Sequence, residues 1–264
     1  MPFAELNDVK LYYTVTGAES KPVLVLSNSL GTSLDMWTPQ LERFASHFRV
    51  LRYDTRGHGK SEVVPGPYTI AQLGNDVIAL LDYLNIERAH FCGLSMGGIT
   101  GMWLGVHHPK RVDRLILSNT AAYIGPPENW TNRIHEIQNN GLASIAPAIV
   151  ARWLTPEFAA AHPAVVTDLL AMLISTPDAG YTAACMAVRD ADLRQDVQNI
   201  TAPTLIISAT FDLPTPPVDG RYLQKSIPGA RYVELSAAHS SNQEQVMPYA
   251  DAVLSFLSEG IIRK

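Results

Sequence analysis

The sequence has 264 residues, which at about 150 residues per domain fits one large domain or a domain with an insertion. Hydrophobic residues make up 47% and charged residues 17% of the chain, which excludes a disordered polypeptide. Twenty Lys and Arg against 25 Asp and Glu give a net charge of -5. Because the chain lacks a basic excess, nucleic acid is not an expected partner.

The cysteine content and the apolar segments bear on the cellular location. Cys92 and Cys185 are too few for a disulfide framework and form no C-x-x-C pair. Residues 1–5 show no basic segment followed by an apolar run, and no window reaches the roughly 18 apolar residues of a membrane span. We therefore expect a cytoplasmic protein with no membrane partner. No feature of the sequence indicates an oligomeric state.

Apolar runs of strand length alternate with helical periodicity in the first half of the chain. Strands are predicted at 23–27, 48–53, 89–92 and 115–117, and helices at 69–84 and 97–107. Thr69 and Gln72 have the spacing of a capping box at the start of the first helix. Parallel neighbouring strands need crossover connections, which are usually helical. The alternation therefore predicts an α/β fold, with a mostly parallel central sheet flanked by helices.

The strand rhythm stops after Asn119 and resumes later. Helical segments are predicted at 132–139, 145–154 and 165–174, with Thr155-Pro156 and Thr176-Pro177 as helix starts. Strands follow at 204–208 and 232–235, and a closing helix at 244–256. We interpret residues 1–121 and 191–264 as the core, and residues 122–190 as an inserted helical cap.

The segment Gly93-Leu94-Ser95-Met96-Gly97 matches the nucleophile-elbow pattern G-x-S-x-G. It follows a predicted strand and precedes a predicted helix, as the elbow requires. A sharp strand-to-helix turn exposes the serine oxygen and needs small residues on both sides. An ordinary glycine-rich turn is the alternative for the pentapeptide alone. Its context favours Ser95 as a nucleophile.

A serine nucleophile needs a base, and the base needs a carboxylate to orient it. Asp212 follows the predicted strand at 204–208, and His239 follows the one at 232–235, in the chain order Ser, Asp, His. Ligands of open α/β sheets bind beyond the carboxyl ends of the strands, where the three residues would meet. Asp219 is a rival for the acid. Each residue taken alone also fits an ordinary turn or loop position.

An oxyanion hole takes one backbone N–H from the residue after the nucleophile and one from the loop after the first long core strand. Met96 and Leu30 are the predicted donors.

No cofactor or metal is predicted. Gly59-Lys60-Ser61 resembles the end of a P-loop, but Asp54 occupies the position of the required first glycine. The histidines show no zinc-protease spacing.

Taken together, these motifs resemble the α/β-hydrolase superfamily and, over the whole length, the 3-oxoadipate enol-lactonases. The stretches that carry the resemblance are Asn28 to Thr32, Asp54 to Ser61, Gly93 to Gly98, Ser118 to Ala122, Ile124 and Gly125, Trp130, and Ala237 to His239 with Ser241 and Asn242. The resemblance implies a small-molecule lactone substrate that carries a carboxylate and is opened by water to 3-oxoadipate, in the catabolism of aromatic compounds.

The cap is expected to supply a cation for the substrate carboxylate, because burying that group unpaired is costly. Arg133 is the first candidate, with Arg152 and Arg189 as rivals, and a solvated helix face is the alternative for each. Trp130 is a candidate wall for the lactone ring or an anchor of the cap.

Two other functions stay open. A carboxylesterase or a carbon-carbon bond hydrolase would use the same three residues with a different cap. A ligand receptor would keep the fold and work by binding, since a fold does not determine a function.

Overall fold

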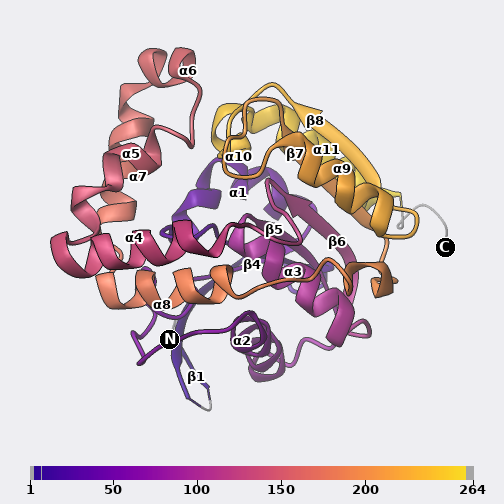
Figure 1. Cartoon of the computed structure of the whole chain (residues 1–264). Helices are drawn as coiled ribbons and strands as arrows, with labels where there is room; N and C mark the ends of the chain where they lie inside the picture. The colour runs from indigo at the N-terminus through magenta and orange to yellow at the C-terminus, as the bar shows by residue number, and fades with distance from the viewer. Residues whose placement is uncertain (1–2, 7, 260–264) are drawn as a thin grey trace.

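The computed structural model describes residues 3–6 and 8–259. Within these residues one eight-stranded sheet has the order β1-β2-β4-β3-β5-β6-β7-β8 (Figure 1). The strands are β1 (Phe3–Glu5), β2 (Lys10–Thr16), β3 (Val23–Ser27), β4 (Arg49–Tyr53), β5 (Ala89–Leu94), β6 (Val112–Ser118), β7 (Thr204–Ala209) and β8 (Arg231–Leu235). β2 pairs antiparallel with both β1 and β4, and the remaining neighbours pair parallel, which confirms the predicted mostly parallel sheet.

Helices cover both faces of the sheet. Those of the core are the 3-10 helices η1 (Leu34–Trp37) and η3 (Val197–Asn199), and the α-helices α1 (Thr38–Ala45), α2 (Ile70–Tyr83), α3 (Met96–His107), α9 (Pro217–Ser226), α10 (Ser241–Glu244) and α11 (Val246–Ser258). Thr69 forms the predicted capping box with Gln72 at the start of α2. None of the described helices is both long enough and apolar enough to cross a membrane.

Alternate residues of the central strands enter two separate hydrophobic clusters. In β3, Val25 packs in the cluster that includes α2 and α3, whereas Leu24 and Leu26 pack in the cluster with α1 and α11. This period of two is what a strand buried on both faces requires. The sheet is thus held between two helical layers, and its strands end at one common edge.

A second group of helices lies between β6 and β7 in the chain and stands on one side of the molecule (Figure 1). The members are α4 (Pro127–Asn140), η2 (Leu142–Ser144), α5 (Ala146–Val150), α6 (Pro156–Ala161), α7 (Pro163–Ile174) and α8 (Asp178–Arg189). Tyr123 and Asp192 form an antiparallel bridge at the base of this insertion. The inserted helical segment agrees with the prediction, while the cap boundaries at 122 and 190 remain a prediction.

Two local predictions within the insertion differ from the structure. Thr176 does not cap α8, because its hydroxyl donates to Gly31 O at 3.3 Å and Met172 O at 3.4 Å, and Pro177 takes the N-cap position. Thr155 does cap α6, as predicted. The helix expected at 145–154 ends at Val150, and turns follow it.

Some core elements carry too weak a signal for sequence analysis. β1 and β2 are partly exposed and lack a long apolar run. The helices α1 and α9 are short and have few buried residues. The prediction that the chain has no export signal was made from residues 1–5. Residues 1 and 2 lie outside the described residues.

A pair of glycines forms a close backbone contact between the inserted helices and the core. A Cβ atom on Gly180 of α8 would lie 2.1 Å from Gly57 O, in the turn after β4. No real Cβ approaches a backbone oxygen so closely, so this crossing requires glycine at position 180. The helix thereby rests directly on the core backbone.

Candidate active site

Ser95 stands in the sharp turn between β5 and α3. Its φ of 57° and ψ of -116° lie outside the ordinary range of a non-glycine residue. The turn is held by Ser95 N, which donates to Ser118 O at 3.0 Å, and by the Thr120 hydroxyl, which donates to Ser95 O at 2.8 Å. A Cβ on Gly97 would lie 2.3 Å from Ser27 O, so the turn needs a glycine there. The local structure is that of a nucleophile elbow.

Asp212 and His239 are joined by a hydrogen bond beyond the ends of β7 and β8. His239 Nδ1 lies 3.0 Å from both carboxylate oxygens of Asp212. Asn119 Nδ2 donates to Asp212 at 2.9 Å, and Thr215 donates through its backbone N–H at 2.9 Å and its hydroxyl at 2.8 Å. The carboxylate therefore has a full set of donors although only 2% of the residue is exposed.

These partners decide the ionisation of the acid. Burial acts to raise the pKa of Asp212, but the adjoining His239 ring and the hydrogen bonds from His239, Asn119 and Thr215 outweigh it and hold the pKa below its ordinary value. An ionised Asp212 fixes Nδ1 of His239 as the protonated nitrogen. That tautomer leaves Nε2 free to accept a proton.

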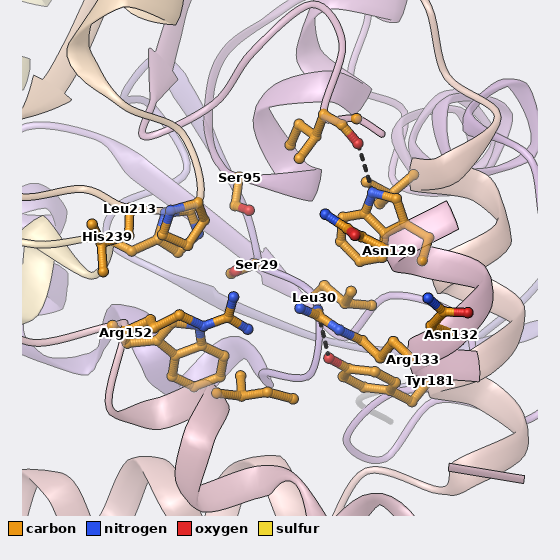
Figure 2. Close-up of a pocket in the computed structure, with 17 residues that line it drawn as sticks. Ser29, Leu30, Ser95, Asn129, Asn132, Arg133, Arg152, Tyr181, Leu213 and His239 are labelled. Carbon is orange, nitrogen blue, oxygen red and sulfur yellow. Dashed lines mark hydrogen bonds between the residues drawn. The ribbon is translucent and has the colours of Figure 1, made fainter. Parts of the chain in front are cut away.

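Ser95 and His239 line the same pocket (Figure 2). The Ser95 hydroxyl forms no hydrogen bond with any described residue at 3.5 Å or less. Hydrogen bonds between a nucleophile and its base commonly tighten only in the complex with substrate. The arrangement is suited to a nucleophile and a base on one side of the pocket, with Asp212 bonded to the His239 ring as the orienting acid.

Two backbone N–H groups lie next to Ser95. Among the described residues, the N–H groups of Leu30 and Met96 have no backbone acceptor, and Leu30 lines the pocket. Gly97 N donates to Asn28 O at 3.0 Å, which ties the loop after β3 to the elbow. The Asn28 side chain anchors that loop further through Tyr53 O at 2.8 Å. Leu30 and Met96 therefore remain the predicted oxyanion donors.

The pocket has a volume of about 410 Å³, and helices of the insertion form its other side (Figure 2). Arg133 on α4 stacks over Trp130 at 4.7 Å and donates to the Tyr181 hydroxyl at 3.4 Å. Arg152, just after α5, also lines the pocket. Burial and the charge of Arg133 lower the pKa of Arg152.

Neither pocket arginine has a carboxylate partner among the described residues. Two guanidinium groups that share one cavity without an anion repel each other, so an anionic ligand would be stabilised between them. The cavity is suited to a small molecule with a carboxylate at one end and an electrophilic carbonyl at the other.

Two rival residues lie elsewhere. Arg189 pairs with its neighbour Asp190 at 2.7 Å and does not line the pocket. Asp219, in the first turn of α9, has no hydrogen bond to His239. Burial and the nearby Asp212 raise the pKa of Asp219 to about 6. The geometry therefore favours Asp212 over Asp219, and Arg133 and Arg152 over Arg189.

The structure also shows site residues that sequence analysis missed. The side chains of Asn119 and Thr215 hold Asp212, and Ser241 donates to Asn119 Oδ1 at 2.6 Å. Asn119 follows β6 directly, so it stands at the same sheet edge as Ser95. Its place just after a predicted strand was the sequence feature that could have identified it. In residues 3–6 and 8–259, no group of three or more His, Cys, Asp or Glu is placed to hold a metal ion.

Comparisons with known proteins agree with this geometry. Residues 22–245 match the family described as the alpha/beta hydrolase fold. The chain is 44% identical over 247 residues to 3-oxoadipate enol-lactonase 2 of Acinetobacter baylyi, with 94% of this chain and 92% of that protein covered. It is 40% identical over 231 residues to 3-oxoadipate enol-lactonase 1 of the same organism, with 88% and 86% covered.

A solved structure shows the same likeness. The crystal structure of the enol-lactonase from Burkholderia xenovorans superposes with a TM-score of 0.96 at 46% identity, covering 97% of this chain and 100% of that one. The matches span nearly the whole chain, including the inserted helices that line one side of the pocket. The chain belongs to the alpha/beta hydrolase fold family and, within it, to the 3-oxoadipate enol-lactonases.

Proposed function

We propose that this protein opens 3-oxoadipate enol-lactone with water to give 3-oxoadipate, in the cytoplasm. The observation that carries the proposal is the single pocket in which Ser95 and His239 face Arg133 and Arg152. Cys92 and Cys185 are both free thiols, which accords with a reducing compartment.

The substrate carries an acetate side chain whose carboxylate must leave water on binding. Guanidinium groups form strong, paired hydrogen bonds with carboxylates. Arg133 and Arg152 would hold the carboxylate, while the Trp130 ring stacks on Arg133 and keeps it in place. The lactone carbonyl would then point toward Ser95.

Catalysis begins with attack on that carbonyl. Ser95 Oγ forms a bond to the carbonyl carbon as His239 Nε2 takes the hydroxyl proton, and Asp212 stabilises the imidazolium that results. The carbonyl oxygen becomes an oxyanion, which accepts hydrogen bonds from the Leu30 and Met96 N–H groups.

Collapse of this intermediate breaks the ring C–O bond. The leaving group is an enolate, a better leaving group than an ordinary alkoxide, and it stays tethered to the acyl chain. His239 returns the proton, and the enol tautomerises to a ketone. Water then attacks the acyl-enzyme with His239 as base, which releases the new carboxylate and restores Ser95.

One assay tests the proposal directly. Purified protein is given 3-oxoadipate enol-lactone or a neutral aryl ester, and loss of each is followed over many turnovers. Rapid lactone loss with slow ester cleavage supports the proposal. Brisk ester cleavage with an inert lactone would indicate a carboxylesterase, and stoichiometric binding without turnover would indicate a receptor.

A further inference from the structure

Glu244 joins the loop that carries His239 to the inserted helices. It is the last residue of α10, shortly after His239 in the chain, and it is half-buried. Its Oε1 accepts a hydrogen bond from Thr155 N at 2.7 Å and another from Ala238 N at 3.2 Å. Its Oε2 accepts from the Thr155 hydroxyl at 2.9 Å. The carboxylate thus bridges the peptide just before His239 and the start of α6.

A second contact fixes the peptide on the other side of His239. Ser240 N donates to Trp153 O at 2.8 Å. The residues on both sides of His239 are therefore bound to the segment 153–155. Trp153 and its neighbour Arg152 line the pocket. The segment that presents one of the pocket cations is the segment to which the His239 loop is attached.

We propose that Glu244 is a positioning residue, which sets the His239 ring relative to Ser95 and ties it to the Arg152 segment. The inference rests on the proposed function, because it takes His239 as the base. Hydrogen bonds from N–H groups to a carboxylate are about twice as strong as neutral ones. A displacement of about 1 Å at a base can cost about 100-fold in rate. A loop held before His239 by the Glu244 carboxylate and after it by Trp153 O is suited to prevent such a displacement.

Removal of the Glu244 carboxylate would affect both ends of the bridge. Ala238 N and Thr155 N would lose their acceptor. Thr155 would also lose an anchor, although its hydroxyl still accepts from Phe158 N at 3.3 Å to cap α6. The His239 loop and the Arg152 segment could then move independently, so both the rate and the binding of an anionic substrate should suffer.

The test compares Glu244→Ala, Glu244→Gln and a matched control, Glu136→Ala. Glu136 is exposed on α4 and accepts a hydrogen bond from Asn140 of the same helix. In Glu244→Ala we expect kcat to fall about tenfold on both the lactone and the neutral ester, and KM to rise for the lactone alone. Glu244→Gln keeps an oxygen for the two N–H groups and should recover most of kcat. The control should match the wild type.

A fluorophosphonate that phosphonylates Ser95 gives a readout that does not depend on the substrate. Its second-order rate with Glu244→Ala should fall in parallel with kcat, because Ser95 activation needs His239 in place. Unchanged phosphonylation and kcat in a folded Glu244→Ala variant would overturn the inference. So would an activity loss that follows only the folded fraction measured by circular dichroism. An inert lactone with wild-type protein, beside normal ester cleavage and phosphonylation, would instead refute the proposed substrate.

Discussion

The core and the inserted helices contribute different kinds of contact to the pocket between them. In the core, Asp212 is buried and accepts hydrogen bonds from three residues, His239, Asn119 and Thr215. In the insertion, the contacts of the Arg133 guanidinium with described residues are the Trp130 ring at 4.7 Å and the Tyr181 hydroxyl at 3.4 Å. Several short bonds hold the acid, whereas loose contacts hold the cation.

This difference shows how one fold can keep its chemistry while its substrates change. The reacting groups need fixed distances, because a small misplacement lowers the rate strongly. A group that only binds a charge tolerates more variation, because charge attraction falls off slowly with distance. We therefore expect substitutions in the core to affect kcat and substitutions in the insertion to affect KM.

The largest effect is expected for Ser95→Ala. The substitution removes the nucleophile, so kcat on the lactone should fall by more than about 10⁴-fold, while the melting temperature stays near that of the wild type. Steady-state kinetics and thermal unfolding measure the two quantities. Wild-type turnover in this variant would show that another residue attacks the carbonyl.

Arg133→Ala tests the insertion in the same way. The loss of a charged hydrogen-bond donor should raise KM for the carboxylate-bearing lactone by about 10- to 100-fold, with kcat on a neutral aryl ester little changed. Arg189→Ala is the matched control, because Arg189 pairs with Asp190 outside the pocket. An equal effect of both variants on the lactone would mean that Arg133 does not bind the substrate carboxylate.

A smaller effect is expected for Tyr181→Phe. The phenol is the hydrogen-bond acceptor of Arg133, and its ring stays in place in the variant. The hydrogen bond that orients Arg133 contributes about 1 kcal/mol, so its loss should raise KM for the lactone about fivefold. KM for the neutral ester should stay unchanged. A drop in kcat on both substrates would mean that Tyr181 serves the reacting groups instead.

The smallest effect concerns stability against pH. Because the folded-state pKa of Asp212 is below its ordinary value, the ionised carboxylate stabilises the fold at pH values above about 4, and this stabilisation is lost as the pH falls through the folded pKa. The free energy of unfolding of the wild type, relative to Asp212→Asn, should therefore be highest near neutral pH. Urea titrations at several pH values measure it. A difference that does not change with pH would contradict the pKa shift.

The sequence carried a strong signal for the core. Alternating strands and helices, the glycines around Ser95 and the order of Asp212 and His239 depend on local chain geometry, which a sequence pattern reflects directly. Asn119 was missed because it meets Asp212 only through the pairing of β6 with β7. Thr215 lies three residues after Asp212 in the same loop, where a single threonine forms no recognisable pattern.

The details of the insertion were harder to predict from the sequence. Its helical character was predicted, and Arg133 was the first candidate for the pocket cation. No sequence pattern separated the rivals Arg152 and Arg189, because each lies on a helix or loop that also has a solvent-facing side. The three-dimensional packing of α4, α5 and α8 decides which cation reaches the pocket. Thr176 illustrates the same limit, since its hydroxyl bonds to Gly31 of the core instead of capping α8.

The contact between Gly180 and Gly57 has a consequence for engineering chimaeras of this protein. The contact leaves no room for a methyl group at position 180. A helical segment transplanted from a relative will therefore pack on this core only if it has glycine at that position. A bulkier residue would lift α8, and with it Tyr181, away from the sheet. Any redesign of specificity through the inserted helices therefore has to keep glycine at position 180.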